Sequence, residues 1–91
     1  MKYHAMEYLQ NPGKGPVMGY VFLEDNDYKR WKKNPIMGEV KGYAVVIGME
    51  SCAEWGKILN ARMWDYGRTY DKLPEDFENI DEWLDNNFLR D

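Results

Sequence analysis

The chain has 91 residues, 44% of them hydrophobic and 15% aromatic, and its 12 Lys+Arg against 16 Asp+Glu give a formal net charge of −4. That length excludes a two-domain enzyme, and the apolar content excludes a wholly disordered chain. A single cysteine excludes an internal disulfide, and no apolar run has the length of a bilayer span or of a signal peptide. We therefore expect one compact domain over residues 1–91, located in the reducing cytoplasm.

The first half of the chain predicts three β-strands. Segments 2–9, 17–24 and 39–49 are rich in Tyr, Val, Phe and Ile, which favour strands. The segments between them, 11–16 and 25–37, contain the prolines and glycines that are typical of turns and loops. Such short connections favour antiparallel pairing of neighbouring strands.

The segment 39–49 is the predicted central strand. Its side chains alternate, so that Tyr43 and Val45 share one face while Val40 and Ala44 share the other. Both faces are mainly apolar, which is the pattern of a strand that is covered on both sides.

The second half predicts two helices, because its apolar residues recur every three or four positions. Ser51 and Glu54 have the spacing of a capping box, so the first helix is expected to begin at Ser51 and to end near Gly67. Its apolar side would consist of Trp55, Ile58, Leu59, Met63, Tyr66 and Tyr70. The second helix is expected to begin between residues 74 and 80, with Phe77, Ile80, Leu84 and Phe88 on its apolar side.

These elements predict an α+β fold in the order β-β-β-α-α. A three-stranded antiparallel sheet would be followed by two C-terminal helices that pack on one of its faces. Three strands are about the minimum for an independently stable sheet. All of the elements would belong to the single domain 1–91.

Few residues are of the kinds that carry out catalysis. His4 and Cys52 are the only histidine and cysteine of the chain, and an enzyme would need both to lie together with a carboxylate. The more ordinary interpretation places His4 on a strand surface and buries Cys52 as a small side chain under the sheet. A position at the start of a helix would instead activate the Cys52 thiol. We expect a protein that is not an enzyme.

Metal and phosphate sites are equally weakly indicated. One histidine and one cysteine do not supply a zinc site. An oxygen-only site at Glu75, Asp76, Glu78 and Asp81 lacks the glycine and the ligand spacing of a calcium loop. The sequence GKGP over 13–16 lacks the spacing of a phosphate loop and precedes a strand, so a hairpin turn is the better interpretation. We expect no metal and no cofactor.

A basic run with interleaved aromatic residues lies within the 25–37 segment. Its members are Tyr28, Lys29, Arg30, Trp31, Lys32 and Lys33. Such side chains contact phosphates and stack on bases, so binding of a small anionic ligand or nucleotide is the alternative function. The other interpretation is a solvated loop in which Trp31 packs against the sheet.

Acidic residues are concentrated near the C-terminus: residues 1–64 carry nine Lys/Arg and seven Asp/Glu, whereas residues 65–91 carry three and nine. If the second helix ran continuously from residue 74, side chains three and four positions apart would form one ridge, about 5–6 Å from one another. The ridge would consist of Glu75, Glu78, Glu82 and Asp85. A solvated helix face that carries acids near its N-terminus is the simpler interpretation.

The candidate partner-binding residues combine these carboxylates with tryptophans, because Trp is enriched among residues that dominate binding energy. They are Glu75, Glu78, Asp81, Glu82, Asp85, Trp64 and Trp83. The acidic charge disfavours direct binding of duplex nucleic acid, which depends on Lys and Arg, and favours a protein partner with a basic surface. No membrane binding is expected.

In size, acidity and lack of catalytic residues, the chain is similar in type to small inhibitor proteins. Examples are phage-encoded antagonists of bacterial defence systems and immunity proteins that neutralise toxins. The likeness is one of composition and architecture, so it assigns no functional residue. The leading hypothesis is a non-enzymatic phage or mobile-element protein whose acidic helix mimics nucleic acid and blocks a nucleic-acid-handling protein.

Overall fold

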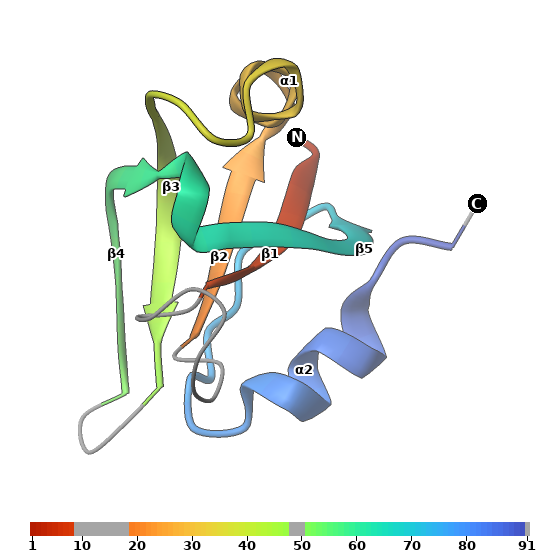
Figure 1. The fold of residues 1–91 in the computed structure, drawn as a ribbon. Helices are drawn as coiled ribbons and strands as arrows, with labels where there is room; N and C mark the ends of the chain where they lie inside the picture. Colours follow the sequence, from red (N-terminus) through yellow and green to blue (C-terminus); the bar gives the residue numbers. More distant parts are fainter. Residues whose placement is uncertain (9–18, 48–50, 91) are drawn as a thin grey trace.

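The computed structural model describes residues 1–8, 19–47 and 51–90, and these contain a five-stranded sheet (Figure 1). Its strands are β1 (Tyr3–Tyr8), β2 (Gly19–Glu24), β3 (Glu39–Val46), β4 (Cys52–Leu59) and β5 (Met63–Tyr70). The other elements are the helices α1 (Asp25–Lys33) and α2 (Ile80–Asn87) and the 3-10 turn η1 (Asn60–Arg62). Every strand pairing is antiparallel. The α+β class and the antiparallel sheet are confirmed, whereas three strands and the order β-β-β-α-α are wrong.

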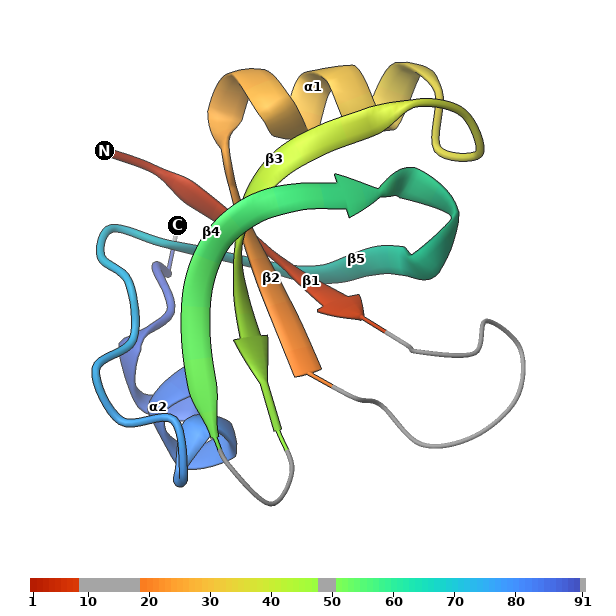
Figure 2. The ribbon, with the colours of Figure 1, turned by 90° about the vertical axis from the view of Figure 1, so that its left-hand side faces the viewer.

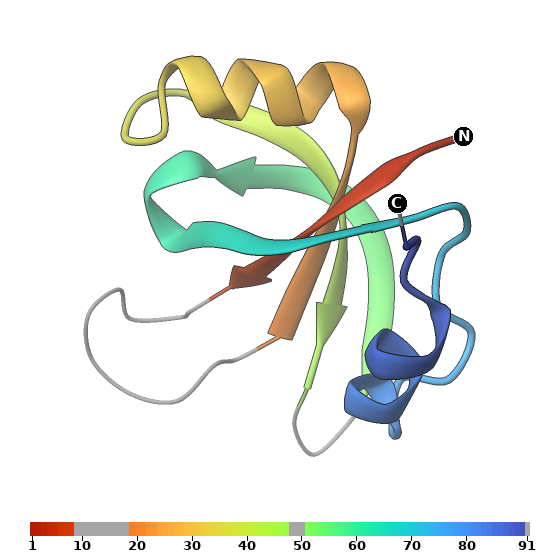
Figure 3. The same cartoon turned by 90° about the vertical axis from the view of Figure 1, so that its right-hand side faces the viewer.

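The sheet is strongly twisted, and η1 carries the chain from one of its edges to the other. The strand order is β4-β3-β2-β1-β5, so β4 and β5 are the two edges although they follow each other in sequence. Figures 2 and 3 show them meeting at one end of the molecule, where η1 joins them. Strand twist and this edge-to-edge connection curl the sheet toward an open barrel with an inner and an outer face.

The segment predicted as the first helix forms β4 and β5 instead. All eight residues of β4 pair with β3, and Glu54 lies opposite Ala44. Ser51 and Glu54 therefore do not form a capping box, although their spacing fits one. Short apolar runs satisfy both the helical and the strand period, and here the long partner β3 supplies backbone hydrogen bonds. A helix would also have carried Gly56 at a cost of about 1 kcal/mol.

Gly67, which was predicted to end that helix, lies at a β-bulge in β5. The pairing of β1 with β5 shifts register between His4 and Met6. Gly67 has a φ of 85°, a left-handed conformation that glycine adopts without steric cost. The Asp65 carboxylate accepts a hydrogen bond from the Gly67 backbone N–H at 2.8 Å. The bulge therefore bends the strand and increases its local twist.

The central strand of the sheet is β2, not β3. β3 and β4 lie on one side of it, and β1 and β5 lie on the other. Five of its six residues are buried, which fits a strand covered on both faces. The alternation predicted for β3 is confirmed, because Val45 packs in the core cluster of the outer face and Val40 in that of the inner face.

The inner face of the curled sheet packs one core cluster, which α1 covers at one end (Figure 2). Its buried members are Met6, Val21, Leu23, Trp31, Val40, Ile58 and Met63. At Gly42 this packing leaves no room for a side chain. A Cβ there would lie 2.5 Å from Cγ1 of Val21 and 2.9 Å from Cδ2 of Leu23.

The outer face packs a second core cluster against α2. Its buried members are Ala5, Tyr20, Phe22, Val45, Tyr70, Ile80 and Leu84. Half-buried aromatic side chains, among them Tyr66, Phe77, Trp83 and Phe88, pack around it. The two helices thus contribute to different clusters, and the prediction that both pack on one face of the sheet is wrong.

α1 occupies most of a segment that was predicted as a loop. Asp25 and Asp27 lie in its first turn, and the basic residues Arg30, Lys32 and Lys33 lie in its last turn, which suits the helix dipole. The buried ring of Trp31 gives the helix a contact with the inner core. No described helix is long and apolar enough to span a membrane.

Candidate functional site

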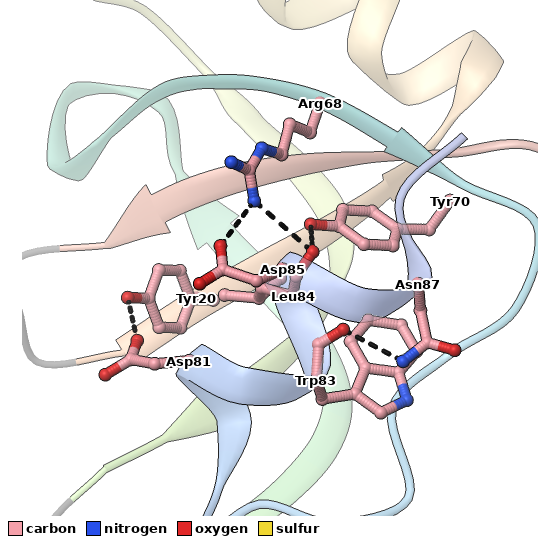
Figure 4. Close-up of polar contacts among 8 residues, drawn as sticks. All are labelled: Tyr20, Arg68, Tyr70, Asp81, Trp83, Leu84, Asp85 and Asn87. Carbon is pink, nitrogen blue, oxygen red and sulfur yellow. Dashed lines mark hydrogen bonds and ion pairs between the residues drawn. The ribbon is translucent and has the colours of Figure 1, made fainter. Parts of the chain in front are cut away.

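The acidic C-terminal segment is fixed to the sheet through α2, mainly by side chains of β5 (Figure 4). The Tyr70 hydroxyl donates a hydrogen bond to the backbone carbonyl of Leu84 at 2.7 Å. Nη1 of Arg68 donates to Oδ1 of Asp85 at 2.8 Å and to the same Leu84 carbonyl at 3.3 Å. The last carbonyls of a helix lack partners within the helix, and a cation there is favourable. Tyr70 and Arg68 therefore hold the end of α2 against the sheet, and they also supply donors for one of its last carbonyls.

Tyr20 holds the other end of the helix. Its hydroxyl donates to Oδ1 of Asp81 at 2.7 Å. Burial, followed by this hydrogen bond, raises the pKa of Tyr20 above its ordinary value. Burial also raises the pKa of Tyr70 to about 12. Both phenols thus remain protonated donors far into the basic range.

The predicted continuous acidic ridge is wrong. α2 begins at Ile80, so Glu75 and Glu78 precede the helix instead of lying along it. Asp81 and Asp85 are exposed, but each accepts a hydrogen bond from the sheet. Of the four residues predicted to form the ridge, only Glu82 and Asp85 lie in the helix itself.

The remaining carboxylates of the acidic segment lie in or next to a turn that precedes α2. The Asp76 carboxylate accepts hydrogen bonds from the Asn79 backbone N–H at 3.3 Å and from the Asn79 side-chain amide at 3.1 Å. These contacts lower the pKa of Asp76. Glu75, Glu78 and Glu82 are exposed beside this turn. We refer to Glu75, Asp76, Glu78 and Glu82 as the acidic surface.

The two candidate tryptophans have different surroundings. The Trp83 ring stacks on Tyr70, with ring centres 5.0 Å apart, and meets the edge of Phe22 at 6.0 Å. It is therefore mainly a part of the outer core. Trp64 is 38% exposed on β5, and its Nε1 donates to a carboxylate oxygen of Glu7 at 3.2 Å. Only Trp64 keeps the surface exposure expected of a binding residue.

The aromatic residues of the basic run are occupied within the protein. Tyr28 stacks on His4 with ring centres 3.7 Å apart, and its hydroxyl donates to Asp65 at 2.6 Å. That hydrogen bond, together with burial, raises the pKa of Tyr28 to about 12. Trp31 is 9% exposed, and its Nε1 donates to the Asn60 carbonyl at 3.4 Å. Neither ring is placed to stack on a nucleotide base.

The cations of the basic run lie on the surface of α1. They are Lys29, Arg30, Lys32 and Lys33, all exposed. Lys29 pairs with Asp25 at 3.1 Å, and Arg30 pairs with Asp27 at 3.5 Å. Exposed pairs within one helix contribute little to stability, so an anion could compete for these cations.

His4 and Cys52 are not brought together. His4 is 8% exposed on β1, and its Nε2 lies 2.9 Å from Oδ1 of Asp25. This hydrogen bond contributes most to lowering the pKa of Asp25. Cys52 is exposed on the edge strand β4, with β2 and β3 between it and β1. Both ordinary expectations, a surface histidine and a buried cysteine, are wrong.

The four carboxylates considered as an oxygen-only metal site do not converge. No three His, Cys, Asp or Glu side chains in residues 1–8, 19–47 and 51–90 gather as metal ligands. Asp76 accepts hydrogen bonds from Asn79, and Asp81 accepts one from Tyr20. Glu75 and Glu78 are exposed.

Sequence reasoning missed the side chains that fix the acidic segment. Tyr20 and Asp81 are 61 positions apart, and no local pattern joins them. Arg68 and Tyr70 carry a weak signal, since residues two apart on a strand share a face. That signal was missed because Tyr70 was assigned to the apolar side of the first predicted helix and not to a strand.

No protein-family model, curated protein or solved structure matches the chain significantly.

Proposed function

We propose that this chain binds a protein partner with a basic surface, and that it does so through the acidic surface. The supporting observation is the fixed position of α2. Tyr20, Arg68 and Tyr70 hold the inward side of the helix against the sheet, so Glu82 lies on a fixed helix, and Glu75, Asp76 and Glu78 lie in the segment that leads directly into it. Groups held on rigid elements lose little conformational entropy on binding.

The charge distribution supports the same proposal. Residues 65–91 carry nine Asp/Glu against three Lys/Arg, and one of these cations, Arg68, is already paired with Asp85. An exposed negative surface accelerates encounter with a positive one and selects against acidic partners. A surface made to bind nucleic-acid phosphates is the natural basic partner, and its occupation would inhibit that protein.

The test is retention of a partner from a lysate of the cells that encode the chain. We expect the tagged protein to retain one nucleic-acid-binding protein in stoichiometric amount. Because the acidic surface takes the place of phosphates, added duplex DNA or RNA should displace that partner. Raised salt should weaken retention as well.

A matched pair of variants separates the acidic surface from overall charge. Glu78→Lys with Glu82→Lys should abolish retention, whereas Glu39→Lys with Glu54→Lys, which changes the net charge equally, should not. Asp85 is left unchanged because its ion pair with Arg68 supports the fold. Retention by the first variant, indifference to nucleic acid, or no retained protein would each contradict the proposal.

A further inference from the structure

A second surface, far from α2 along the chain, lies where the end of α1 meets the loop that follows it. The start of β3 and η1 border the same place. A pocket of about 290 Å³ opens there, and its lining includes Arg30, Lys33, Asn34, Met37, Glu39 and Asn60. A water molecule takes about 30 Å³ of liquid, so the volume corresponds to roughly ten waters. That is the size of a small metabolite.

Asn60 at this pocket is unusually constrained. It is 3% exposed, and its side-chain Nδ2 donates to the carbonyls of Asn34 at 2.6 Å and Met37 at 2.5 Å. Because both partners are acceptors, the amide cannot be turned over without losing both hydrogen bonds. Its Oδ1 is consequently the buried side-chain oxygen that has no hydrogen-bond partner in the described structure.

A buried acceptor without a partner calls for a donor, because leaving it unsatisfied is costly. Asn34 and Met37, whose carbonyls hold the Asn60 amide, also line the pocket. Oδ1 itself is buried, so a ligand hydroxyl reaches it only if the exposed loop of residues 34–39 shifts away from Asn60. The Glu39 carboxylate in the lining is a second acceptor for hydroxyl groups.

The rim of the pocket supplies positive charge. Arg30 and Lys33 are adjacent on the exposed side of α1, since they are three positions apart. The Arg30 contact with Asp27 is long, at 3.5 Å, and solvent-exposed. Two cations beside two acceptors suit a ligand that has an anionic group at one end and hydroxyl donors at the other.

We propose that this pocket binds a small phosphate monoester that carries hydroxyl groups, such as a pentose phosphate. Arg30 and Lys33 contact the phosphate, while Asn60 Oδ1 and Glu39 accept from the hydroxyls. Base recognition is not part of the site, since Tyr28 and Trp31 pack within the protein. The pocket lies at the end of α1, whereas the acidic surface lies in the first turn of α2 and the segment before it, so this proposal and the proposed function fail independently.

The experiment is a titration of the ¹⁵N-labelled full chain followed by NMR. Ribose 5-phosphate should shift the Asn60 side-chain amide signals in a saturable way. Inorganic phosphate lacks the sugar hydroxyls, n-butyl phosphate lacks hydroxyls beyond its phosphate, and ribose lacks the phosphate. All three should bind about tenfold or more weakly, because each loses charge-assisted or buried hydrogen bonds.

A matched pair of variants tests the rim. Lys33→Gln should weaken ribose 5-phosphate binding about tenfold, whereas Lys32→Gln, with the same change of charge on the neighbouring residue, should leave it nearly unchanged. Equal effects of the two variants would show non-specific attraction to α1 and overturn the site. Equal binding of n-butyl phosphate, or no saturable shift at millimolar ribose 5-phosphate, would overturn it too.

Discussion

Two glycines that face each other across β3 and β4 meet opposite structural demands. Gly42 and Gly56 are directly paired. A Cβ on Gly42 would overlap the side chains of Val21 and Leu23 in the inner core, whereas a Cβ on Gly56 would meet no heavy atom within 4 Å. The sequence does not distinguish them, because the difference arises from their places in the sheet. Gly42 lies on the interior strand β3, and Gly56 lies on the edge strand β4.

Substitution of each glycine by alanine should therefore give opposite results. Gly42→Ala should lower the free energy of unfolding by about 1–3 kcal/mol, because the core must move to accept the methyl group. Gly56→Ala should leave it unchanged or raise it by about 0.5–1 kcal/mol, because alanine loses less backbone entropy on folding. Urea denaturation measures both, and a comparable loss in the two variants would contradict this account of the packing.

At the scale of elements, α1 is positioned by polar contacts as well as by Trp31. Asp25 at its start bonds with His4 of β1, and Tyr28 in its middle bonds with Asp65 of β5. The helix is only nine residues long, which is too short to be stable alone in water. Its existence therefore depends on these contacts with strands whose bonded residues are 21 and 37 positions away in the sequence.

The Tyr28 contact predicts a pH dependence. Its hydrogen bond to Asp65, followed by burial and the negative charge of Asp65, raises the pKa of Tyr28 from 10.0 to about 12. A folded-state pKa above the unfolded value gives stability that is complete below pH 10 and is lost as pH rises toward about 12. Asp65→Asn should lower the Tyr28 titration midpoint toward 10, as followed by phenolate absorbance or NMR. An unchanged midpoint would mean that burial alone sets this pKa.

Element prediction succeeded where local pattern and tertiary pairing agreed. β1, β2 and β3 lie within the three predicted strand segments, and α2 begins at Ile80, the last residue of the predicted window of 74–80. It failed for Cys52–Leu59 and Met63–Tyr70, where spacing compatible with a helix was overridden by pairing with β3 and β1. It also missed α1, because the proline and glycine that suggested a loop lie just beyond the end of the helix.

For the whole molecule, closure of the curled sheet depends on the turn η1 between the two edge strands. Asn60 at its start bonds with the carbonyls of Asn34 and Met37, which ties this turn to the loop after α1. The Trp31 indole adds a contact to the Asn60 carbonyl at 3.4 Å. Asn60 therefore joins the connection between the sheet edges to the element that covers the inner core.

Asn60→Ala should consequently destabilise the entire domain. It removes the two hydrogen bonds that the Asn60 side-chain amide donates to the carbonyls of Asn34 and Met37. At about 0.5–1.5 kcal/mol for each bond, we expect the free energy of unfolding to fall by about 1–3 kcal/mol. Arg62→Ala, at the other end of the same turn, should cost much less because its half-exposed side chain lies outside this network. Guanidinium denaturation compares the two, and a similarly small effect of both would contradict the role assigned to Asn60.

The distribution of charge was determined by the sequence, whereas the use of each charge was decided by the tertiary structure. Basic residues of α1 and acidic residues around α2 remain apart in space, as they are along the chain (Figure 1). Local composition is sufficient for that, because exposed charge needs no particular partner. Contact with Tyr20 and Arg68, however, distinguishes Asp81 and Asp85 from Glu78 and Glu82.

The α+β class, the antiparallel strands of the first half, the C-terminal helix and the acidic segment could all be predicted from the order of the residues. These follow from alternation, periodicity and composition, which are properties of neighbouring residues. Three features required the folded structure: 52–59 and 63–70 form two further strands, Trp83 and Trp31 pack inward, and Asn60 bonds with Trp31 of α1 and with the loop after it. These depend on contacts between residues far apart in the chain, whose energies outweigh the small local preferences.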